Sequence, residues 1–373
     1  MKYFIILIGM FGFLQALSQE NNWRKQSITD QNKYSTESNL AGRMVLTEYD
    51  NTINRGTTRK KDPLENLIYI NGNTTYNVRY LEGSEKRLLV RRNNGSEKKL
   101  DLNYAGGTHI INDEGYIVSV DFAHGAGADF IFLSPDLINL NIYKPFASTY
   151  KEFQIGSSDN LVCIYTSQDI EARIYKMALL DKQGNLKIEK EFPISQQHIG
   201  FHVEIINKKV FLFLNVYNDL MKDYTSKILA FDESLNQLWE KDYNGRVGYN
   251  PQSNPQKNEL LVTQKNQIIN LNAINGNTNW LFNTDLIVSP VLNTTTLLDQ
   301  KYVMDGKYVV VNAGLYNRET QIYDENILII IDATNGNATY KEALGSTLQK
   351  LNIISLKKSF LLVKVNQIFE YKN

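Results

Sequence analysis

One sequence motif recurs four times in the second half of the chain and constrains the fold more than any other feature. Its copies cover residues 175–192, 228–243, 268–285 and 327–344. Each copy reads as a β-strand, a tight polar turn and a second strand. In the last two copies Asn-Gly supplies the positive φ angles that a hairpin turn needs. Units roughly 40–60 residues apart, each too small to bury its own apolar face, predict an array in which neighbours bury one another.

Strand-like segments follow one another from residue 66 to the C-terminus, and they group in fours. The complete groups cover residues 66–102, 107–146, 152–194, 198–243, 250–285 and 288–344. The last group, 347–373, supplies only three strands, and the isolated segment Arg43–Tyr49 is the natural fourth. Joining the chain ends in this way would remove exposed sheet edges. We therefore predict an all-β fold, a β-propeller of seven four-stranded blades, closed by an N-terminal strand that pairs with the C-terminal blade.

Other all-β arrays fit the sequence less well. Uneven spacing leaves six or eight blades as alternatives. A parallel β-helix would need shorter, more regular coils without hairpin turns, and tandem sandwiches would need separate cores and linkers. The predicted organisation is a signal peptide over 1–18, a flexible leader over 19–39, a closing strand and linker over 40–65, and the propeller over 66–373.

The N-terminus has the three parts of a secretory signal peptide. Lys2 forms a short positive region, an apolar run extends from Tyr3 to Leu14, and Ala16-Leu17-Ser18 gives a small-x-small cleavage site before Gln19. The run is shorter than the roughly 20 residues that span a bilayer, which argues against an uncleaved anchor. We expect an exported protein, periplasmic or extracellular, with no stable membrane insertion after the signal is cleaved.

Composition argues against several partners and sites. Lys plus Arg and Asp plus Glu both number 40, so the formal net charge is zero and a nucleic acid is not the expected partner. Cys163 is the only cysteine, which rules out an internal disulfide and a cysteine-based metal cluster. His198 and His202 would lie about 13 Å apart on one strand, too far to share a metal ion. We predict no metal and no cofactor.

The turns of the repeated motif resemble those of a known family. Leu271-Asn272-Ala273-Ile274-Asn275-Gly276 is followed by Trp280, and the segment from Ile331 to Gly336 is followed by Tyr340. Phe231-Asp232 with Trp239 and Leu180-Asp181 with Gly184 are shorter copies. These segments resemble the tryptophan-docking repeat of pyrroloquinoline-quinone-type β-propellers, whose pattern is Leu-Asp-Ala-x-Thr-Gly-x-x-x-Trp.

The resemblance implies a structural mechanism and leaves the function open. In that family the Asp caps the turn and the aromatic residue wedges between adjacent blades. The family includes quinone-dependent dehydrogenases and catalytically silent scaffolds. This chain lacks the adjacent cysteines of the dehydrogenases and the lipid-modified cysteine of an outer-membrane assembly scaffold. Neither function is carried over, because fold does not imply function.

The segment from Asp121 to Asp129 is the best candidate for catalytic chemistry. It places His124 between two carboxylates, and its small residues let the backbone approach a ligand closely. Tyr104, His109 and Tyr116 lie nearby in the sequence. These residues suggest, as the alternative function, a polysaccharide-degrading enzyme, a lyase or hydrolase, with its site near His109 and His124 on the same face as the long connections described next. A glycine-rich loop that only turns a strand is the commoner use of such a segment, so the sequence favours a protein without catalytic residues.

Three long connections carry tyrosine and arginine residues suited to binding. They cover residues 215–226, 244–255 and 312–325. Their candidate ligand-binding residues are Tyr217, Tyr224, Arg246, Tyr249, Tyr316, Arg318 and Tyr323. Tyr and Arg are enriched at binding hot spots, and long loops on a rigid scaffold often carry function, although the same tyrosines could pack the loops onto the sheets. We therefore predict a non-enzymatic propeller that binds a protein or glycan through this long-loop face.

Overall fold

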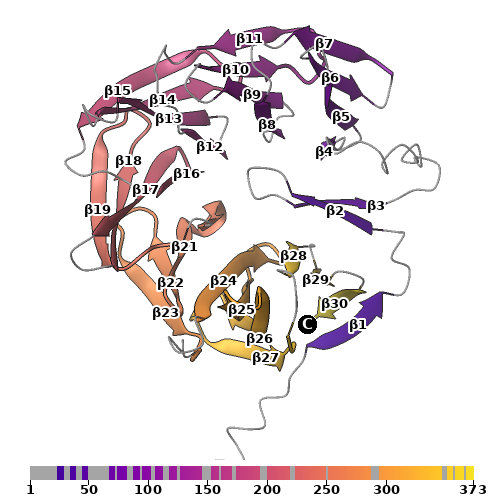
Figure 1. The fold of residues 1–373 in the computed structure, drawn as a ribbon, viewed down its shortest axis with the longest axis vertical. Helices are drawn as coiled ribbons and strands as arrows, with labels where there is room; N and C mark the ends of the chain where they lie inside the picture. Colours follow the sequence, from indigo (N-terminus) through magenta and orange to yellow (C-terminus); the bar gives the residue numbers. More distant parts are fainter. Residues whose placement is uncertain are drawn as a thin grey trace, which may run out of the picture. The chain divides into compact units, whose positions relative to one another are not determined.

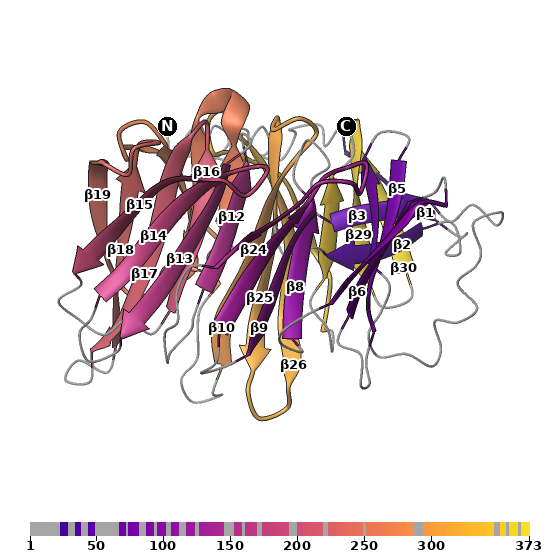
Figure 2. The same cartoon turned by 90° about the horizontal axis from the view of Figure 1, so that it is seen from above.

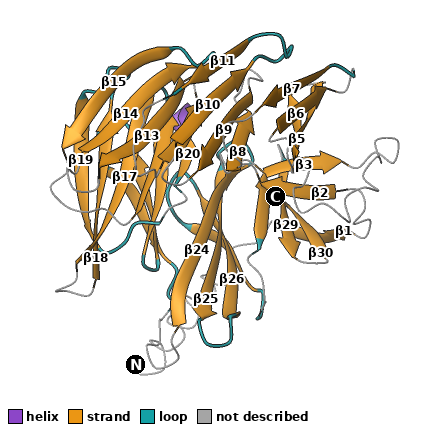
Figure 3. Cartoon of the chain, turned by 45° about the horizontal axis from the view of Figure 1, so that its top comes forward, coloured by secondary structure: helices purple, strands orange, loops and turns teal. Residues whose placement is uncertain are grey.

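The computed structural model describes most of the strand-like segments found in the sequence. The described residues are 23–28, 34–38, 44–48, 67–71, 74–81, 87–92, 95–101, 106–111, 117–123, 127–144, 153–158, 161–169, 174–193, 200–218, 223–248, 251–286, 294–346, 351–355, 358–364 and 367–373. Strands dominate this part of the chain, and its only helix is the short 3-10 turn η3 (Pro255–Lys257) (Figure 3). The predicted all-β class is confirmed.

Two compact units divide the chain. The larger unit comprises Asp30–Ile287, and the smaller unit joins Met1–Thr29 to Val288–Asn373. Five four-stranded sheets lie in the larger unit, together with a hairpin of β2 (Tyr34–Ser38) and β3 (Met44–Glu48). Two four-stranded sheets lie in the smaller unit. Figure 1 colours these sheets in chain order.

The sheets of the larger unit are antiparallel, and each takes four strands that are consecutive in the chain. The first has β4 (Leu67–Asn71), β5 (Thr74–Leu81), β6 (Arg87–Arg92) and β7 (Glu97–Asp101). The second has β8 (Gly106–Ile111), β9 (Ile117–Ala123), β10 (Gly127–Leu133) and β11 (Leu140–Tyr143). The third has β12 (Phe153–Ser158), β13 (Leu161–Asp169), β14 (Ile174–Asp181) and β15 (Leu186–Pro193).

The remaining two sheets of the larger unit repeat the pattern. One has β16 (Gly200–Ile206), β17 (Lys209–Asn218), β18 (Asp223–Phe231) and β19 (Gln237–Asn244). The other has β20 (Gln252–Asn254), β21 (Glu259–Gln264), β22 (Gln267–Asn272) and β23 (Thr278–Asn283). Every group of four strands that the sequence predicts in this unit corresponds to one sheet.

The smaller unit takes its last strand from the N-terminus of the chain. Its first sheet has β24 (Thr294–Val303), β25 (Tyr308–Asn317), β26 (Ile322–Asp332) and β27 (Ala338–Ala343). Its second has β28 (Asn352–Ser355), β29 (Ser359–Lys364), β30 (Gln367–Lys372) and β1 (Arg24–Ile28). An N-terminal strand therefore pairs with the C-terminal group, as predicted, with Arg24 opposite Lys372 and Ile28 opposite Ile368.

The identity of that N-terminal strand differs from the prediction. We predicted Arg43–Tyr49, but β3 pairs with β2 instead, and β1 occupies the edge of β30. The physical reason is the anchor that precedes β1. Trp23 is buried among Tyr308, Phe360 and other apolar residues of the smaller unit. Burying a large aromatic side chain stabilises a strand that is itself polar.

The repeated motif pairs its two strands in the same register in four sheets. The third and fourth strands pair Leu179 with Ile188, Ala230 with Trp239, Asn270 with Trp280 and Ile330 with Tyr340. A register shift follows each of these pairs, immediately before the turn. Ile188 therefore takes the position of the aromatic residue in the copy that lacks one.

The turns are capped as the family resemblance implies. Oδ1 of Asp232 accepts hydrogen bonds from the backbone N–H groups of Ser234 and Asn236, both at 2.8 Å. Asp181 accepts the equivalent pair at 2.9 Å. In the longer turns, Asn272 and Asp332 each accept one such bond, at 2.8 and 2.7 Å. These side-chain bonds satisfy backbone donors that a tight turn leaves unpaired.

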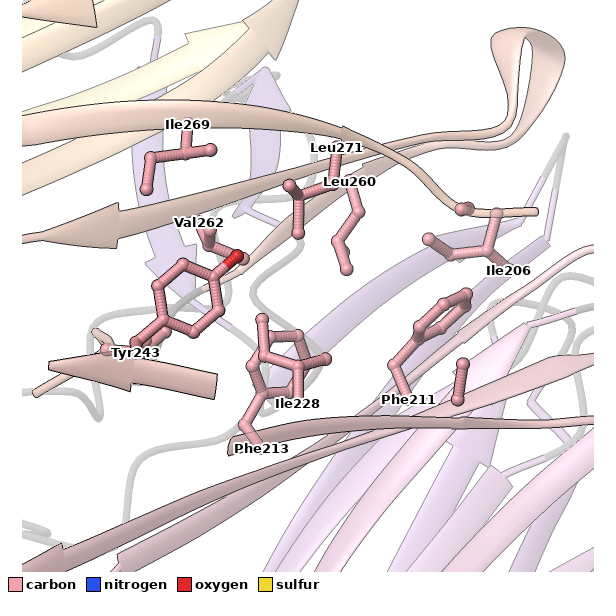
Figure 4. Close-up of a cluster of buried hydrophobic side chains, with 12 residues drawn as sticks. Ile206, Phe211, Phe213, Ile228, Tyr243, Leu260, Val262, Ile269 and Leu271 are labelled. Carbon is pink, nitrogen blue, oxygen red and sulfur yellow. The ribbon is translucent and has the colours of Figure 1, made fainter. Parts of the chain in front are cut away.

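Apolar cores lie between neighbouring sheets of the larger unit. Figure 4 shows one of them, in which Phe211, Phe213 and Ile228 of one sheet face Leu260 and other residues of the next. A second core joins Met177 and Leu179 of β14 to Val203, Leu212 and other residues of the β16–β19 sheet. Neighbouring sheets therefore bury one another's faces, as expected of a repeat array.

The aromatic residues of the repeat differ in burial. Trp280 is 8% exposed, as predicted, whereas Trp239 and Tyr340 are only partly buried and pack against the edges of their cores. The indole N–H of Trp239 donates to the backbone carbonyl of Ala273 at 3.3 Å, in the turn of the next sheet. The predicted wedge between sheets is therefore present at Trp239.

The long connections of the sequence are mostly strand. β17 runs to Asn218 and β18 begins at Asp223, so the segment predicted as a loop over 215–226 is the end of a hairpin. The segment over 312–325 likewise belongs to β25 and β26, and Figure 2 shows this hairpin closing in a turn at its far end. Cross-strand pairing of β-branched and aromatic residues favours extended strands here.

Candidate functional site: two tyrosine-bearing hairpin tips

The β17–β18 hairpin carries a pair of tyrosines near its end. Tyr217 and Tyr224 are direct cross-strand partners, with ring centroids 5.1 Å apart in an edge-to-face arrangement. Both are half-buried. Aromatic pairs across a hairpin stabilise its end and present a rigid aromatic surface. Two of the predicted ligand-binding residues are thus brought together.

Arg246 joins this pair from the segment that follows β19. Its guanidinium carbon lies 5.5 Å from the centroid of the Tyr224 ring, a cation–π contact. The backbone N–H of Gly245 donates to the carbonyl of Tyr224 at 2.7 Å. Tyr217, Tyr224 and Arg246 therefore form one cluster, named here the basic tip. Tyr249, the fourth residue predicted in this region, lies outside the described residues.

A buried polar network fixes the segment that carries Arg246. Asn215 and Ser226 are 1% and 4% exposed and hydrogen-bond to each other. Ser226 also donates to the carbonyl of Gly245 at 2.8 Å. The backbone N–H of Val247 donates to Oδ1 of Asn215 at 3.0 Å. Both neighbours of Arg246 in the chain are thereby held against β17 and β18.

This network is costly in stability. Nδ2 of Asn215 and the hydroxyl of Tyr243 are buried without a hydrogen-bond partner, and burial raises the pKa of Tyr243. An unsatisfied buried polar atom costs about 1–3 kcal/mol. A network kept at this cost fits a role in positioning Arg246. The sequence analysis placed Asn215 and Ser226 in a loop and missed them; polar residues flanking the Tyr pair were the available signal.

The β25–β26 hairpin of the smaller unit carries a second tyrosine pair. Tyr316 and Tyr323 are cross-strand partners with ring centroids 5.1 Å apart. Burial, with smaller contributions from Tyr316 and Asp299, raises the pKa of Tyr323. Oδ1 of Asn317 accepts the backbone N–H of Glu319 at 3.0 Å and so caps the turn that holds the exposed Arg318. This cluster is named here the acidic tip, because its carboxylates include Asp299, Asp324 and Glu325.

The two tips are built on matching positions of their sheets. Gly314 opposite Asn326 corresponds to Asn215 opposite Ser226. Nδ2 of Asn326 donates to the carbonyl of Gly345 at 3.3 Å, as Ser226 donates to Gly245. A methyl group on Gly314 would lie 3.0 Å from Oδ1 of Asn326 and 3.1 Å from the Tyr323 ring. The glycine therefore leaves room for the polar side chain on the opposite strand.

The residues of the alternative, enzymatic reading are only partly described. Tyr104, Tyr116 and His124 lie outside the described residues. His109 is on β8 opposite Ser119, and Asp121 on β9 is directly opposite Asp129 on β10. Asp129 is buried, and its carboxylate lies 3.5 Å from Nζ of Lys144. The enzymatic reading stays a prediction.

Within the described part of the chain, no group of three or more His, Cys, Asp and Glu side chains is arranged to hold a metal ion. His198 falls outside that part, and His202 lies with Nε2 3.7 Å from Oε2 of Glu204. Ser253 donates to the other oxygen of Glu204 at 3.1 Å. His202 therefore takes part in a polar cluster between β16 and β20.

Comparisons with known proteins bear on the fold. No protein-family model and no curated protein matches the sequence. The structure is similar to BamB from Moraxella catarrhalis, a PQQ-like β-propeller, with 11% identity, a TM-score of 0.52, and coverage of 93% of this chain and 98% of that one. The likeness supports the predicted resemblance to pyrroloquinoline-quinone-type propellers at the level of the fold.

Two further solved structures are less similar to this chain. The crystal structure of the eukaryotic initiation factor has 10% identity and a TM-score of 0.48, covering 82% of this chain and 69% of that one. A variant of the apocarotenoid oxygenase of Synechocystis has 11% identity and a TM-score of 0.43, covering 75% of this chain and 71% of that one.

Where the structure describes the chain, it contains no helix with the length and apolar character needed to cross a membrane.

Proposed function

We propose that this chain is an exported, non-enzymatic β-propeller of seven blades, closed by β1, that binds a protein or glycan partner through its basic and acidic tips. Export rests on the signal-peptide pattern of residues 1–18. The propeller rests on the four-stranded sheets and on the likeness to BamB. Binding rests on the tips, and no cofactor is needed for it.

One observation carries the binding proposal. Two matching hairpins, one in each unit, end in a cross-strand tyrosine pair with the same centroid separation of 5.1 Å. Each pair has an arginine: Arg246 contacts the Tyr224 ring, and Arg318 lies two residues after Tyr316 in the sequence. Tyrosine and arginine supply large contact area and directional hydrogen bonds at little entropic cost, because a paired aromatic ring is already ordered. Half-buried rings in rigid hairpins are therefore suited to contact a partner.

The test is crosslinking and pull-down of the native partner by tagged protein expressed in its own host. The double variants Tyr217→Ala/Tyr224→Ala and Tyr316→Ala/Arg318→Ala should each reduce recovery of the partner while keeping the fold by circular dichroism. Ile274→Ala is a matched control, because Ile274 is 54% exposed but lies in a turn at the opposite end of its strands. Recovery that falls only with Ile274→Ala would move the site to the tight turns and refute the proposal.

A further inference from the structure

We infer that the basic tip binds an acidic, extended segment of a partner protein through the carboxylates of that segment. The inference rests on the proposed function and names the chemistry of its ligand. Its basis is the convergence of two cations and two aromatic rings on one fixed segment of backbone, residues 244–247.

The second cation is Lys265, which comes from a different sheet. A methyl group on Gly245 would lie 3.0 Å from Cε and 3.8 Å from Nζ of Lys265, so its ammonium lies beside the residue that precedes Arg246. Gln264, its neighbour, donates from Nε2 to the carbonyl of Asn244 at 2.8 Å and ties the β21–β22 turn to the same segment. Arg246 and Lys265 are both exposed.

The geometry around Arg246 suits a carboxylate. A guanidinium has forked, coplanar N–H donors that can form paired bonds to a carboxylate, and an aromatic face close to it attracts the cation without using those donors. Lys265 adds a second positive charge next to it. Asp223, at the start of β18, accepts the backbone N–H of Tyr224 at 2.8 Å.

The acidic tip shows that the positive charge is not a general property of such hairpins. Its matching tyrosine pair is accompanied by Asp299, and Asp324 accepts a hydrogen bond from Asn317 at 3.1 Å. Glu325 is exposed beside them. Two tips with the same tyrosine pair and opposite charge are expected to select different ligands.

An extended protein segment fits the basic tip better than a single small anion. One exposed cation holds an anion weakly in water. The basic tip and Lys265 together offer two cations and two half-buried rings, and only a ligand with several groups can contact all of them at once. The segment 244–247 is already ordered by Asn215 and Ser226, so little ordering cost is added on binding.

The test is fluorescence anisotropy with the full mature chain at low salt and three labelled probes. They are a ten-residue peptide of alternating Glu and Ser, the same peptide with Lys in place of Glu, and tetragalacturonate. We expect binding of the Glu peptide alone, weakened by added salt because exposed charges are screened. Arg246→Glu/Lys265→Glu should raise its Kd at least about tenfold, and Arg246→Gln/Lys265→Gln should raise it by a smaller factor.

The matched control is Lys208→Glu/Lys257→Glu. It makes the same change in net charge on the same two sheets, at exposed residues near the opposite ends of the strands. Its Kd should stay within about twofold of the wild type. An equal loss of binding in this control, or equal binding of the Lys peptide, would overturn the inference by showing unspecific attraction.

Other outcomes separate the inference from the proposed function. Binding of tetragalacturonate without binding of the Glu peptide overturns the protein segment in favour of an acidic glycan. Loss of the native partner in Tyr217→Ala/Tyr224→Ala, together with full recovery in Arg246→Glu/Lys265→Glu, overturns the acidic ligand and leaves the proposed function standing.

Discussion

The indole ring of Trp239 lies directly on Gly276, which belongs to the turn of the next sheet. A methyl group in place of the glycine hydrogen would stand 2.9 Å from Cε3 and 3.0 Å from Cδ2 of that ring. Nζ of Lys241, two residues further along β19, donates to the carbonyl of the same glycine at 3.0 Å. One turn therefore receives both an aromatic ring and an ammonium from its neighbour.

The same relation recurs along the larger unit with different residues. Nζ of Lys190 donates to the carbonyl of Leu235 at 3.3 Å, and Nδ2 of Asn141 donates to the carbonyl of Gln183 at 3.0 Å. A methyl group on Gly184 would stand 2.3 Å from the ring of Phe132. Each turn is therefore held by the outer strands of the preceding sheet, which couples the stability of one sheet to the next.

Gly276→Ala should destabilise the protein more than Gly345→Ala does. Both glycines have positive φ, +75° and +72°, which costs an alanine about 1–2 kcal/mol. A methyl group on Gly345 would meet nothing within 4 Å, whereas one on Gly276 would collide with Trp239. The collision should add about 1–3 kcal/mol. Urea denaturation of the two variants measures the difference, and equal losses would show that Trp239 does not rest on this turn.

Much of this architecture could be predicted because it is local in sequence. The Asn-Gly and Asp-x-x-Gly turns, the alternation of apolar residues and the aromatic residue after each turn fall within about 20 residues of one another. They therefore predict strand, turn and strand without knowledge of the rest of the chain. The groups of four strands between residues 66 and 344 follow from the same signals.

The partner of the C-terminal strand could not be predicted, because the pairing is long-range and its strand is polar. Residues 24–28 read Arg-Lys-Gln-Ser-Ile, without the alternation that indicates a half-buried strand. Arg43–Tyr49 reads as a strand and belongs to none of the groups of four, which is why the sequence favours it as the closing strand. Trp23 stabilises the pairing of β1 by packing against Tyr308, which is more than 270 residues away in the sequence. Such a contact depends on tertiary packing and has no local signal in the sequence.

The sequence predicted several residues of the candidate site but not the contacts that hold them in place. Tyr217, Tyr224 and Arg246 were named from residue type, and the structure brings them together. Their support by Asn215 and Ser226 depends on cross-strand register and on the return of the chain after β19. Neither can be read from residues treated as a loop.

Trp280→Ala should cost about 3–5 kcal/mol of stability, the range for a buried large aromatic side chain. Trp280 is 8% exposed, at the position where the repeat places its aromatic residue. Leu281→Ala is the control, because Leu281 is the next residue of β23 and is 50% exposed. It should cost well under about 1 kcal/mol. Similar chemical denaturation curves for the two variants would contradict the burial of Trp280.

A mature chain that begins at residue 30 should lose the edge strand of the C-terminal sheet. Its β30 edge would be unpaired and the site of Trp23 empty, so we expect a lower melting temperature and aggregation at moderate concentration. Trp23→Ala in the full mature chain should reproduce most of the loss of stability. Deletion of 34–48 is the control. It removes β2 together with β3, the strand that the sequence favoured, so neither strand of that hairpin is left unpaired, and it should leave light scattering unchanged. A truncated chain that melts with the wild type would refute the role of β1.

Stability should fall at acid pH through Glu342. Its burial opposes ionisation, but hydrogen bonds from Lys25, Tyr371 and Tyr340 outweigh this and hold the pKa of the carboxyl below its ordinary value of about 4.5. A carboxyl with a lowered pKa in the folded state stabilises the fold above its unfolded pKa. That stability is lost as the pH falls through the lower, folded pKa.

The measurement is the free energy of unfolding between pH 3 and pH 7. Glu342→Gln should be less stable than the wild type at pH 7. The gap should begin to narrow below about pH 4.5, the ordinary pKa of the carboxyl, and close as the pH falls through the lower, folded pKa, where the wild-type carboxyl becomes protonated. Glu319→Gln is the control, since Glu319 is exposed in the turn of the acidic tip. A gap that stays constant over this range would show that the Lys25–Glu342 contact does not depend on the charge.

Asn215→Ala should loosen the segment that carries Arg246 without touching a ligand. It removes the oxygen that accepts from Val247 and Ser226, and leaves the backbone N–H of Val247 with the hydroxyl oxygen of Ser226, at 3.1 Å, as its acceptor. We expect a loss of about 0.5–1.5 kcal/mol, the net contribution of one hydrogen bond, and faster hydrogen exchange over residues 245–247. Asn254→Ala is the control, because Asn254 is a buried asparagine of the same unit whose Nδ2 has no hydrogen-bond partner. If partner binding falls with Asn215→Ala and holds with Asn254→Ala, the ordering of Arg246 by the buried network contributes to recognition. Unchanged exchange over 245–247 would show that the network does not hold the segment.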